Sequence, residues 1–182
     1  MNRDKVISVK NLSKKFGEFI AVDRISFEVE RGEIFGFLGA NGAGKTTAMR
    51  MLCGLSFPTS GSGTIAGYDI MTQGEKIKQH IGYMSQRFSL YEDLTVWENI
   101  RLYAGIYGLN RRQTPRRTVE LLDRLQFRSE IRTRVGSLPL GWKQKLAFSV
   151  ATLHRPEVVF LDEPTGGVDP VTRRQFWELI YE

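Results

Sequence analysis

The sequence predicts an α/β protein with a mostly parallel sheet, a small antiparallel β layer at the N-terminus and an inserted helical subdomain. Three observations support this fold class. An apolar segment at residues 34–38 leads through a glycine-rich loop into a helix-forming stretch. Helical periodicity dominates residues 87–153, and a second apolar segment, Val158–Leu161, ends directly in two acidic residues. Apolar strands that end in polar loops and alternate with helices are typical of parallel sheets.

Length and composition are those of a globular protein. The 182 residues, 41% of them hydrophobic, can bury a core, and we expect one domain made of residues 1–86, 87–153 and 154–182. The sequence has neither an apolar run near the roughly 18 residues of a membrane helix nor an N-terminal signal segment. A single cysteine, Cys53, excludes an internal disulfide framework, so we expect a cytoplasmic protein. The net charge of +6 suits nucleotides, anionic lipids or nucleic acid and selects none of them.

Alternating segments near the N-terminus predict the antiparallel layer. Apolar and polar residues alternate at positions 6–9 and 25–29, and residues 63–66 supply a third short strand. Phe16 lies on the loop between the first two segments, with two lysines beside it. Such a ring either packs on its neighbours or offers a flat surface to an adenine, and its position alone leaves both open.

Residues 39–47, Gly-Ala-Asn-Gly-Ala-Gly-Lys-Thr-Thr, match the phosphate-loop pattern G-x-x-x-x-G-K-[ST] in full. Residues 34–38 before them predict a buried strand and residues 46–53 predict a helix, which is the context that the motif requires. Because glycine adopts positive φ angles, successive backbone N–H groups and the helix N-terminus can face one phosphate. A plain glycine turn is less favoured, and the dinucleotide pattern G-x-G-x-x-G does not fit these glycines.

The residue types of this loop predict a nucleoside triphosphate with Mg²⁺. Lys45 is expected to reach the β- and γ-phosphates, and the Thr46 hydroxyl to coordinate Mg²⁺. The rest of the phosphate cradle is formed by Gly39, Asn41, Gly42, Ala43, Gly44 and Thr47.

Two polar positions at strand ends complete the predicted site. Asp162 and Glu163 follow the strand Val158–Leu161, and with a phosphate loop upstream we expect chemistry rather than simple strand termination. Asp162 would hold Mg²⁺, and Glu163 would orient or deprotonate the attacking water. Gln86 follows a short apolar strand at residues 80–84, where its amide binds a metal, positions a water or merely lies in a surface turn.

Local signals also place the helices of the inserted part. Thr95 and Glu98 form a capping-box pattern before a helix expected over residues 96–106. Thr114 is expected to cap a second helix that has Pro115 at its first position.

Apolar residues at helical spacing predict a small core for this second helix, formed by Val119, Leu122 and Leu125. The same part of the chain is also the most basic. Its arginines include Arg111, Arg112, Arg116, Arg117, Arg128, Arg132 and Arg134. A solvated face is expected there, and a docking surface for an anionic partner is the alternative.

The order of these motifs resembles that of the ATP-binding subunits of ABC transporters, over nearly all 182 residues. A phosphate loop, the strand-end Gln86, the glycine-bearing segment 138–144, the acidic strand end and Asp169 follow one another as in that family. Residues 89–99 and 138–144 look like the branch that drives ABC-2 type exporters, including drug-efflux systems.

The resemblance implies roles that the residues alone leave open. Phe16 would stack on the adenine of ATP, Gln86 would sense Mg²⁺ and couple to a membrane partner, and Asp169 would communicate across a dimer. Backbone N–H groups from Gly141 onward would complete the site of a facing subunit. The implied partners are a second ATP-binding domain, arranged head to tail, and a transmembrane permease on the inner face of the cell membrane.

Two features depart from the family pattern. The signature segment usually begins Leu-Ser-Gly-Gly, whereas Pro139 and Leu140 replace the serine and the first glycine. Proline offers neither a hydroxyl nor an N–H group to a phosphate. The family also continues into a loop with a switch histidine, and neither His80 nor His154 matches it. We therefore expect a truncated domain and assign no catalytic role to either histidine.

The predicted function is ATP hydrolysis that powers transport, with export through an ABC-2 type permease. A soluble ABC ATPase that acts on the ribosome or on nucleic acid is the alternative, supported by the arginine-rich region, although nucleic acid is not the expected partner. A third hypothesis, a fragment that binds nucleotide without turnover, concerns only the activity of this chain alone.

Overall fold

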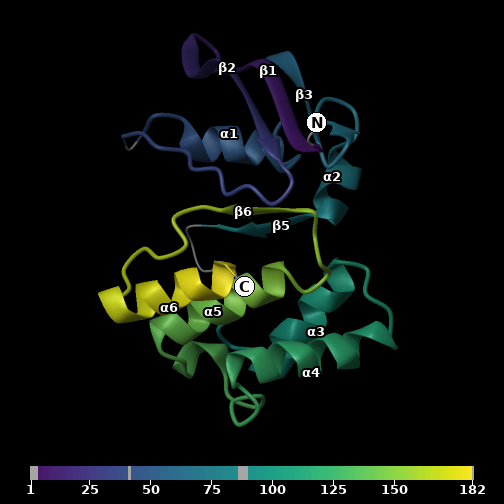
Figure 1. Cartoon of the computed structure of the whole chain (residues 1–182), viewed down its shortest axis with the longest axis vertical. Helices are drawn as coiled ribbons and strands as arrows, with labels where there is room; N and C mark the ends of the chain where they lie inside the picture. The colour runs from purple at the N-terminus through teal and green to yellow at the C-terminus, as the bar shows by residue number, and fades with distance from the viewer. Residues whose placement is uncertain (1–3, 41, 86–89, 182) are drawn as a thin grey trace. The chain divides into compact units, whose positions relative to one another are not determined.

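The computed structural model describes residues 4–40, 42–85 and 90–181, which belong to two compact units (Figure 1). The first unit comprises Met1–Gly82 with Pro156–Phe160, and the second comprises Tyr83–Arg155 with Leu161–Glu182. Each unit is built by its own pattern of strands and helices.

An antiparallel sheet of four strands, in the order β2-β1-β3-β4, forms the base of the first unit. Its strands are β1 (Lys5–Phe16), β2 (Phe19–Glu30), β3 (Ser60–Ile65) and β4 (Tyr68–Asp69). In the register of β1, Val9 lies opposite Phe27 of β2 on one side and Gly63 of β3 on the other. The predicted antiparallel layer is confirmed, and its first two strands are longer than the alternating segments that predicted them.

The first unit also contains the helices α1 (Lys45–Leu52) and α2 (Gly74–His80). Helix α1 lies beside the sheet in Figure 1, and its Met51 and Leu52 are fully buried, as are Leu12 and Ile65 of the sheet. Cys53, directly after α1, is buried with them. Burial of one helix face against a sheet is the main source of stability for a helix of this length.

Strands β5 (Ile81–Met84) and β6 (Val158–Leu161) form a separate two-stranded sheet. The N–H of Glu157 donates to the His80 carbonyl, and the N–H of Asp162 donates to the Met84 carbonyl. Residue numbers therefore rise together along both strands, which makes the pair parallel. Both strands lie where the apolar segments predicted them.

The predicted buried strand at residues 34–38 is wrong. No strand is assigned there, and Leu38 is 97% exposed. A strand needs a hydrogen-bonded neighbour, and no ladder of the described residues reaches this segment. Its Phe35 ring instead stacks on Phe27 of β2, with the centroids 5.1 Å apart.

The second unit is mainly helical. It contains α3 (Val96–Ile106), α4 (Gln113–Leu125), the 3-10 turn η1 (Val135–Ser137), α5 (Leu140–Ala151) and α6 (Pro170–Tyr181). Its core includes Val96, Ile100, Leu122, Phe127, Leu146 and Phe176. Among the described residues, no helix is long and apolar enough to cross a membrane.

The capping box at the start of α3 is confirmed. The Thr95 hydroxyl accepts the N–H of Glu98 at 3.2 Å, and the Glu98 carboxylate accepts the N–H of Thr95 at 2.8 Å. The second bond is the main reason why the pKa of Glu98 lies below its ordinary value.

The predicted cap at Thr114 is wrong, because α4 begins earlier. The Asn110 side chain accepts the N–H of Gln113 at 2.9 Å and starts the turn that leads into the helix. Pro115 then lies within the first turn, where a missing N–H costs nothing.

The buried face of α4 is also shifted from the prediction. Leu122 and Leu125 are buried as expected, but Val119 is 49% exposed. Thr118 and Leu121 take its place on the buried face. The Thr118 hydroxyl can be buried because it donates to a backbone carbonyl one helical turn earlier, at 2.8 Å.

Candidate functional site

The phosphate loop, residues 39–47, owes its shape to glycines. Gly42 and Gly44 both have φ near +82°, in the left-handed region that favours glycine. A Cβ at Gly44 would overlap the carbonyl oxygen of Ala21 on β2, whereas one at Gly42 would meet nothing within 4 Å. Gly44 is thus required by conformation and by space, and Gly42 by conformation alone.

Positive charge is concentrated where this loop meets α1. Helix α1 begins at Lys45 and has no acidic residue in its first turn. The Lys45 ammonium donates to the carbonyls of Gly39 at 2.7 Å and Ala40 at 2.8 Å, which closes the loop on itself. Because the first N–H groups of a helix and an ammonium both attract anions, this loop fits a phosphate. The described residues exclude Asn41, so its predicted role stays a prediction.

Phe16 lies at the end of the β1–β2 hairpin. It pairs with Phe19 across the turn, and its side chain is 55% exposed. The Lys14 ammonium lies 5.1 Å from the ring centroid. Ala21, the residue that approaches Gly44, lies in β2 only two positions after Phe19. The exposed Phe16 ring therefore belongs to the end of the hairpin that borders the phosphate loop.

The carboxylate loop, residues 162–169, begins with two acids in different environments. Asp162 is buried, and its N–H donates to the Met84 carbonyl at 2.9 Å. Glu163 is exposed and has φ near +51°. A non-glycine residue in this conformation costs about 1–2 kcal/mol. Strain of this kind is concentrated at functional sites, where the surrounding structure holds it in place.

Asp169 ends the carboxylate loop and caps α6, as predicted. Its carboxylate accepts the N–H groups of Val171 and Thr172, both at 3.0 Å. The hydrogen bond from the Thr172 side chain and these backbone bonds hold the pKa of Asp169 below its ordinary value. The end of the loop is therefore fixed to the start of α6.

The signature-like segment forms the start of α5. The Pro139 carbonyl accepts the N–H groups of Trp142 and Lys143, both at 3.0 Å. A Cβ at Gly141 would overlap the Thr172 side chain of α6, so packing inside the unit already requires a glycine here. The predicted phosphate contact of Gly141 stays a prediction.

One residue with a contact to the carboxylate loop was not singled out by the sequence. Gln144 of α5 is only 7% exposed, and its Nε2 donates to the Gly166 carbonyl at 3.1 Å. The sequence signal for this contact is weak: Gln144 is a polar residue next to the mostly apolar stretch of α5 at residues 146–151.

The predicted site residues are distributed over both units. The first unit contains the phosphate loop and Phe16, while the second contains Gly141, the two acids and Asp169. Gln86 lies outside the described residues.

Both histidines make contacts within their own units. His80 bonds to the Lys76 carbonyl at 2.8 Å and to the Tyr68 hydroxyl at 3.3 Å. His154 stacks on Tyr107 with the centroids 3.9 Å apart. Burial raises the pKa of Tyr107 to about 12.

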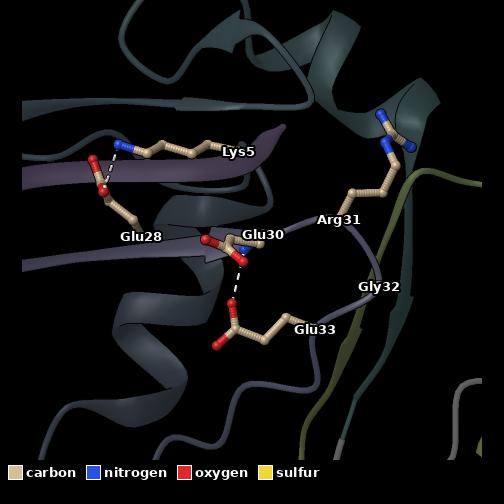
Figure 2. A pocket seen from close by; sticks show the side chains of 6 residues that line it. All are labelled: Lys5, Glu28, Glu30, Arg31, Gly32 and Glu33. Carbon is tan, nitrogen blue, oxygen red and sulfur yellow. Dashed lines mark hydrogen bonds and ion pairs between the residues drawn. The ribbon is translucent and has the colours of Figure 1, made fainter. Parts of the chain in front are cut away.

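Apart from the predicted site residues, a concave surface lies at the end of the β1–β2 ladder, lined by Lys5, Glu28, Glu30, Arg31, Gly32 and Glu33 (Figure 2). Its charges are largely paired with one another or with neighbours. Lys5 lies 2.7 Å from Glu28, which lowers the pKa of that carboxyl, and Arg31 contacts both Asp4 and Glu157. No group of three metal-binding side chains occurs among the described residues. The ion pairs of Lys5 with Glu28 and of Arg31 with Asp4 therefore hold together the ends of β1 and β2 at this surface.

A glycine loop that ends in lysine at a helix start, together with a strand that ends in buried and exposed carboxylates, defines the class of P-loop nucleoside triphosphatases. Comparison with known proteins identifies the family. Residues 22–166 match the family described as "ABC transporter", and the chain belongs to it.

Curated relatives agree with this assignment. The chain is 48% identical to the probable multidrug ABC transporter ATP-binding protein YbhF of Escherichia coli, over 96% of this chain and 30% of that protein. It is 35% identical to the linearmycin resistance ATP-binding protein LnrL of Bacillus subtilis, over 96% of this chain and 56% of that protein. The chain thus spans between about a third and a little over half of the length of these relatives.

Solved structures agree with the fold. An ATP-binding subunit of an ABC transporter superposes with a TM-score of 0.84 at 31% identity, covering 97% of this chain and 73% of that one. CbiO1 of Clostridium perfringens, part of the complex cbiONQ, gives 0.86 at 25% identity, covering 98% and 73%. The predicted family and fold class are confirmed, and the chain is an ATP-binding domain of the ABC type.

Proposed function

We propose that this chain hydrolyses ATP to power export through an ABC-2 type permease. The observation that carries the proposal is the phosphate loop, in which Gly44 packs closely on the Ala21 carbonyl and α1 begins at Lys45. Its left-handed glycines allow successive N–H groups to face one anion, and the Lys45 ammonium adds a positive charge beside them. Such a loop has the chemistry to bind the phosphates of ATP.

The residues assigned to Mg²⁺ fit that ion by their chemistry. Thr46, Asp162 and Gln86 offer a hydroxyl, a carboxylate and an amide oxygen, which are the hard oxygen ligands that Mg²⁺ prefers. When bound, Mg²⁺ would neutralise charge on the phosphates. The burial of Asp162 suits a carboxylate that binds a cation rather than water.

Glu163 is proposed as the catalytic base. Its carboxylate is exposed where that of Asp162 is buried, so the two neighbouring acids are suited to different tasks. Glu163 would accept a proton from the water that attacks the γ-phosphate, while Lys45 would stabilise the developing charge. Phe16 would stack on the adenine with its exposed ring.

The proposed partners are a second ATP-binding domain and a membrane permease, which would place the protein at the cytoplasmic face of the membrane. The names of YbhF, a probable multidrug ABC transporter ATP-binding protein, and of LnrL, a linearmycin resistance ATP-binding protein, support export. CbiO1 is described as part of a larger complex, which supports assembly with other subunits. These relatives do not favour the alternative of a ribosome- or nucleic-acid-directed ATPase.

Replacing Lys45 by alanine tests ATP binding. We expect Lys45→Ala in the full-length protein to weaken binding of a fluorescent ATP analogue at least about 100-fold, because two charge-assisted hydrogen bonds to phosphate are lost. Lys10→Ala, at an exposed lysine of β1, is the matched control and should leave the affinity unchanged. Equal affinities of parent and Lys45→Ala would contradict the proposal.

Replacing Glu163 by glutamine tests hydrolysis separately. Glu163→Gln should keep ATP binding and lower the turnover of the permease complex roughly 100-fold or more, since general-base catalysis contributes that much. Glu178→Gln, at an exposed glutamate of α6 paired with Arg174, is the control and should turn over normally. Parental turnover by Glu163→Gln would show that another group is the base.

A further inference from the structure

Gln144 is a buried amide that contacts the carboxylate loop. It lies on α5 with 7% of its surface exposed. Its Nε2 donates to the Gly166 carbonyl at 3.1 Å. Its Oε1 is buried and accepts no hydrogen bond within the part of the chain that the structure describes.

Packing alone does not account for a glutamine at this position. A buried acceptor without a donor costs about 1–3 kcal/mol, and a methionine of similar length would avoid that cost. The bond to Gly166 recovers only part of it, because a neutral hydrogen bond contributes about 1 kcal/mol. The value of the amide therefore lies in the geometry that it imposes on the carboxylate loop.

The turn that Gln144 contacts through Gly166 also contains Glu163. The N–H of Gly166 donates to the Glu163 carbonyl at 3.0 Å, which closes a tight turn. Glu163 begins this turn in the left-handed conformation, with φ near +51°. Gln144 holds the other end of the same turn through the Gly166 carbonyl. A strained residue keeps its conformation only where its surroundings fix it, and this bond supplies such a restraint.

Neighbouring contacts join the same two segments. A Cβ at Gly167 would lie 3.7 Å from the Leu140 side chain, and Gly141 packs closely on Thr172. The start of α5 therefore touches the carboxylate loop and the helix that follows it at three successive places. Gln144 provides the hydrogen bond among these contacts.

We propose that Gln144 is a positioning residue, which holds the turn of Glu163 in the orientation needed for hydrolysis. The inference rests on the proposed role of Glu163 as base. Gln144 contacts the Gly166 carbonyl of the carboxylate loop. It acts on the backbone that carries the carboxylate, so its loss affects turnover and not ATP affinity.

Two replacements of Gln144 separate these effects. Gln144→Met keeps the volume and removes the amide, and Gln144→Glu keeps the shape but has no N–H to donate. In the full-length protein with its permease, both should lower kcat roughly 10- to 100-fold, because small displacements of catalytic groups have effects of that size. KM for ATP and the affinity for a fluorescent ATP analogue should stay at the parental values, and the thermal unfolding midpoint of Gln144→Met should not fall below that of the parent.

Gln175→Met is the matched control. Gln175 is an exposed glutamine of α6 that accepts from Lys145 of α5 at 2.9 Å, so its loss removes a polar contact of α5 that does not involve the carboxylate loop. We expect parental kcat from this variant. An equal fall in kcat for Gln175→Met and Gln144→Met would indicate general loosening of the helices and would overturn the proposal.

A double variant shows whether Gln144 acts through Glu163. In the Glu163→Gln background, adding Gln144→Met should cause no further loss of the residual rate, because the base is already absent. A further tenfold loss, or parental kcat in the Gln144 single variants, would reject the positioning role. Failure of the parent to bind the ATP analogue would instead reject the proposed function, so the two failures are distinguishable.

Discussion

The phosphate loop and the carboxylate loop are held by different kinds of contact. In the phosphate loop, Lys45 bonds to carbonyls five and six positions before it, so its polar contacts are local. In the carboxylate loop, Gly166 is held by a residue 22 positions earlier, and Asp162 by the Met84 carbonyl of β5. The first loop is specified by its own residue types, and the second depends on distant segments.

The two loops also differ in how they reach left-handed backbone. Gly42 and Gly44 adopt φ near +82°, which glycine does at no steric cost. Glu163 adopts φ near +51° with a full side chain, at a cost of about 1–2 kcal/mol. The carboxylate loop therefore needs restraint from outside, and the phosphate loop needs only room for its backbone.

The largest effect is expected in the phosphate loop at Gly44. Gly44→Ala would place a methyl group on the Ala21 carbonyl oxygen and force a positive φ on alanine. Because a backbone atom cannot move aside cheaply, we expect a loss of at least about 3 kcal/mol in unfolding free energy. Binding of a fluorescent ATP analogue should be lost with it. Urea unfolding and a binding titration measure both.

Gly42→Ala is the control for that variant. Gly42 has the same φ, but a Cβ there meets nothing within 4 Å, so only the conformational cost of about 1–2 kcal/mol remains. If both alanine variants lost the same unfolding free energy, the close approach of β2 to the loop would not be a determinant of its shape.

A smaller effect is expected at Gly141, where the carboxylate loop and α6 adjoin the start of α5. Gly141→Ala would push a methyl group into the Thr172 side chain and should cost about 1–3 kcal/mol of unfolding free energy. Thr172→Ser removes the methyl group that is in the way, so the double variant should recover most of the loss. Urea unfolding of the three variants gives the coupling energy.

Additive effects of the two substitutions would contradict this packing. The start of α6, which follows the carboxylate loop, would then lack this contact with α5. A recovered double variant would show that side chains set the glycine requirement at Gly141, whereas backbone sets it at Gly44.

Sequence reasoning predicted the features that depend on neighbouring residues. The phosphate loop, the capping box of Thr95 and the cap of α6 by Asp169 all follow from patterns within a few positions. The same holds for strands β5 and β6, whose apolar segments end in polar residues.

Features set by distant partners were not predicted correctly. The segment at residues 34–38 has the residue types of a strand, yet no neighbour pairs with it among the described residues. The start of α4 is an exception, because it was misplaced although its determinant is local. The Asn110 side chain accepts the N–H of Gln113 and starts the turn before the helix, whose cap position, Arg112, makes no side-chain capping bond. The bond between Gln144 and Gly166 joins positions that no local pattern connects.

The smallest expected effect concerns Asp169, at the C-terminal end of the carboxylate loop. The pKa of Asp169 is lowered, first by the hydrogen bond from the Thr172 side chain, from an ordinary value of 3.8. The folded protein therefore favours the carboxylate, and its contribution to stability is complete above that value. It is lost as the pH falls below 3.8 through the lowered pKa of the folded state.

Asp169→Ala should accordingly be less stable than the parent at neutral pH, by less than Gly44→Ala or Gly141→Ala, and this difference should shrink on acidification. Asp169→Asn still accepts the N–H groups of Val171 and Thr172, so it should lose less stability at neutral pH and show a weaker pH dependence. Urea unfolding of the three proteins between about pH 6 and pH 3 measures these differences. If the gap between the parent and Asp169→Ala stayed constant over that range, the ionised carboxylate would not be what fixes the loop to α6. The carboxylate loop would then be held by its contacts with Gln144 and with the Met84 carbonyl, without a contribution from the charge of Asp169.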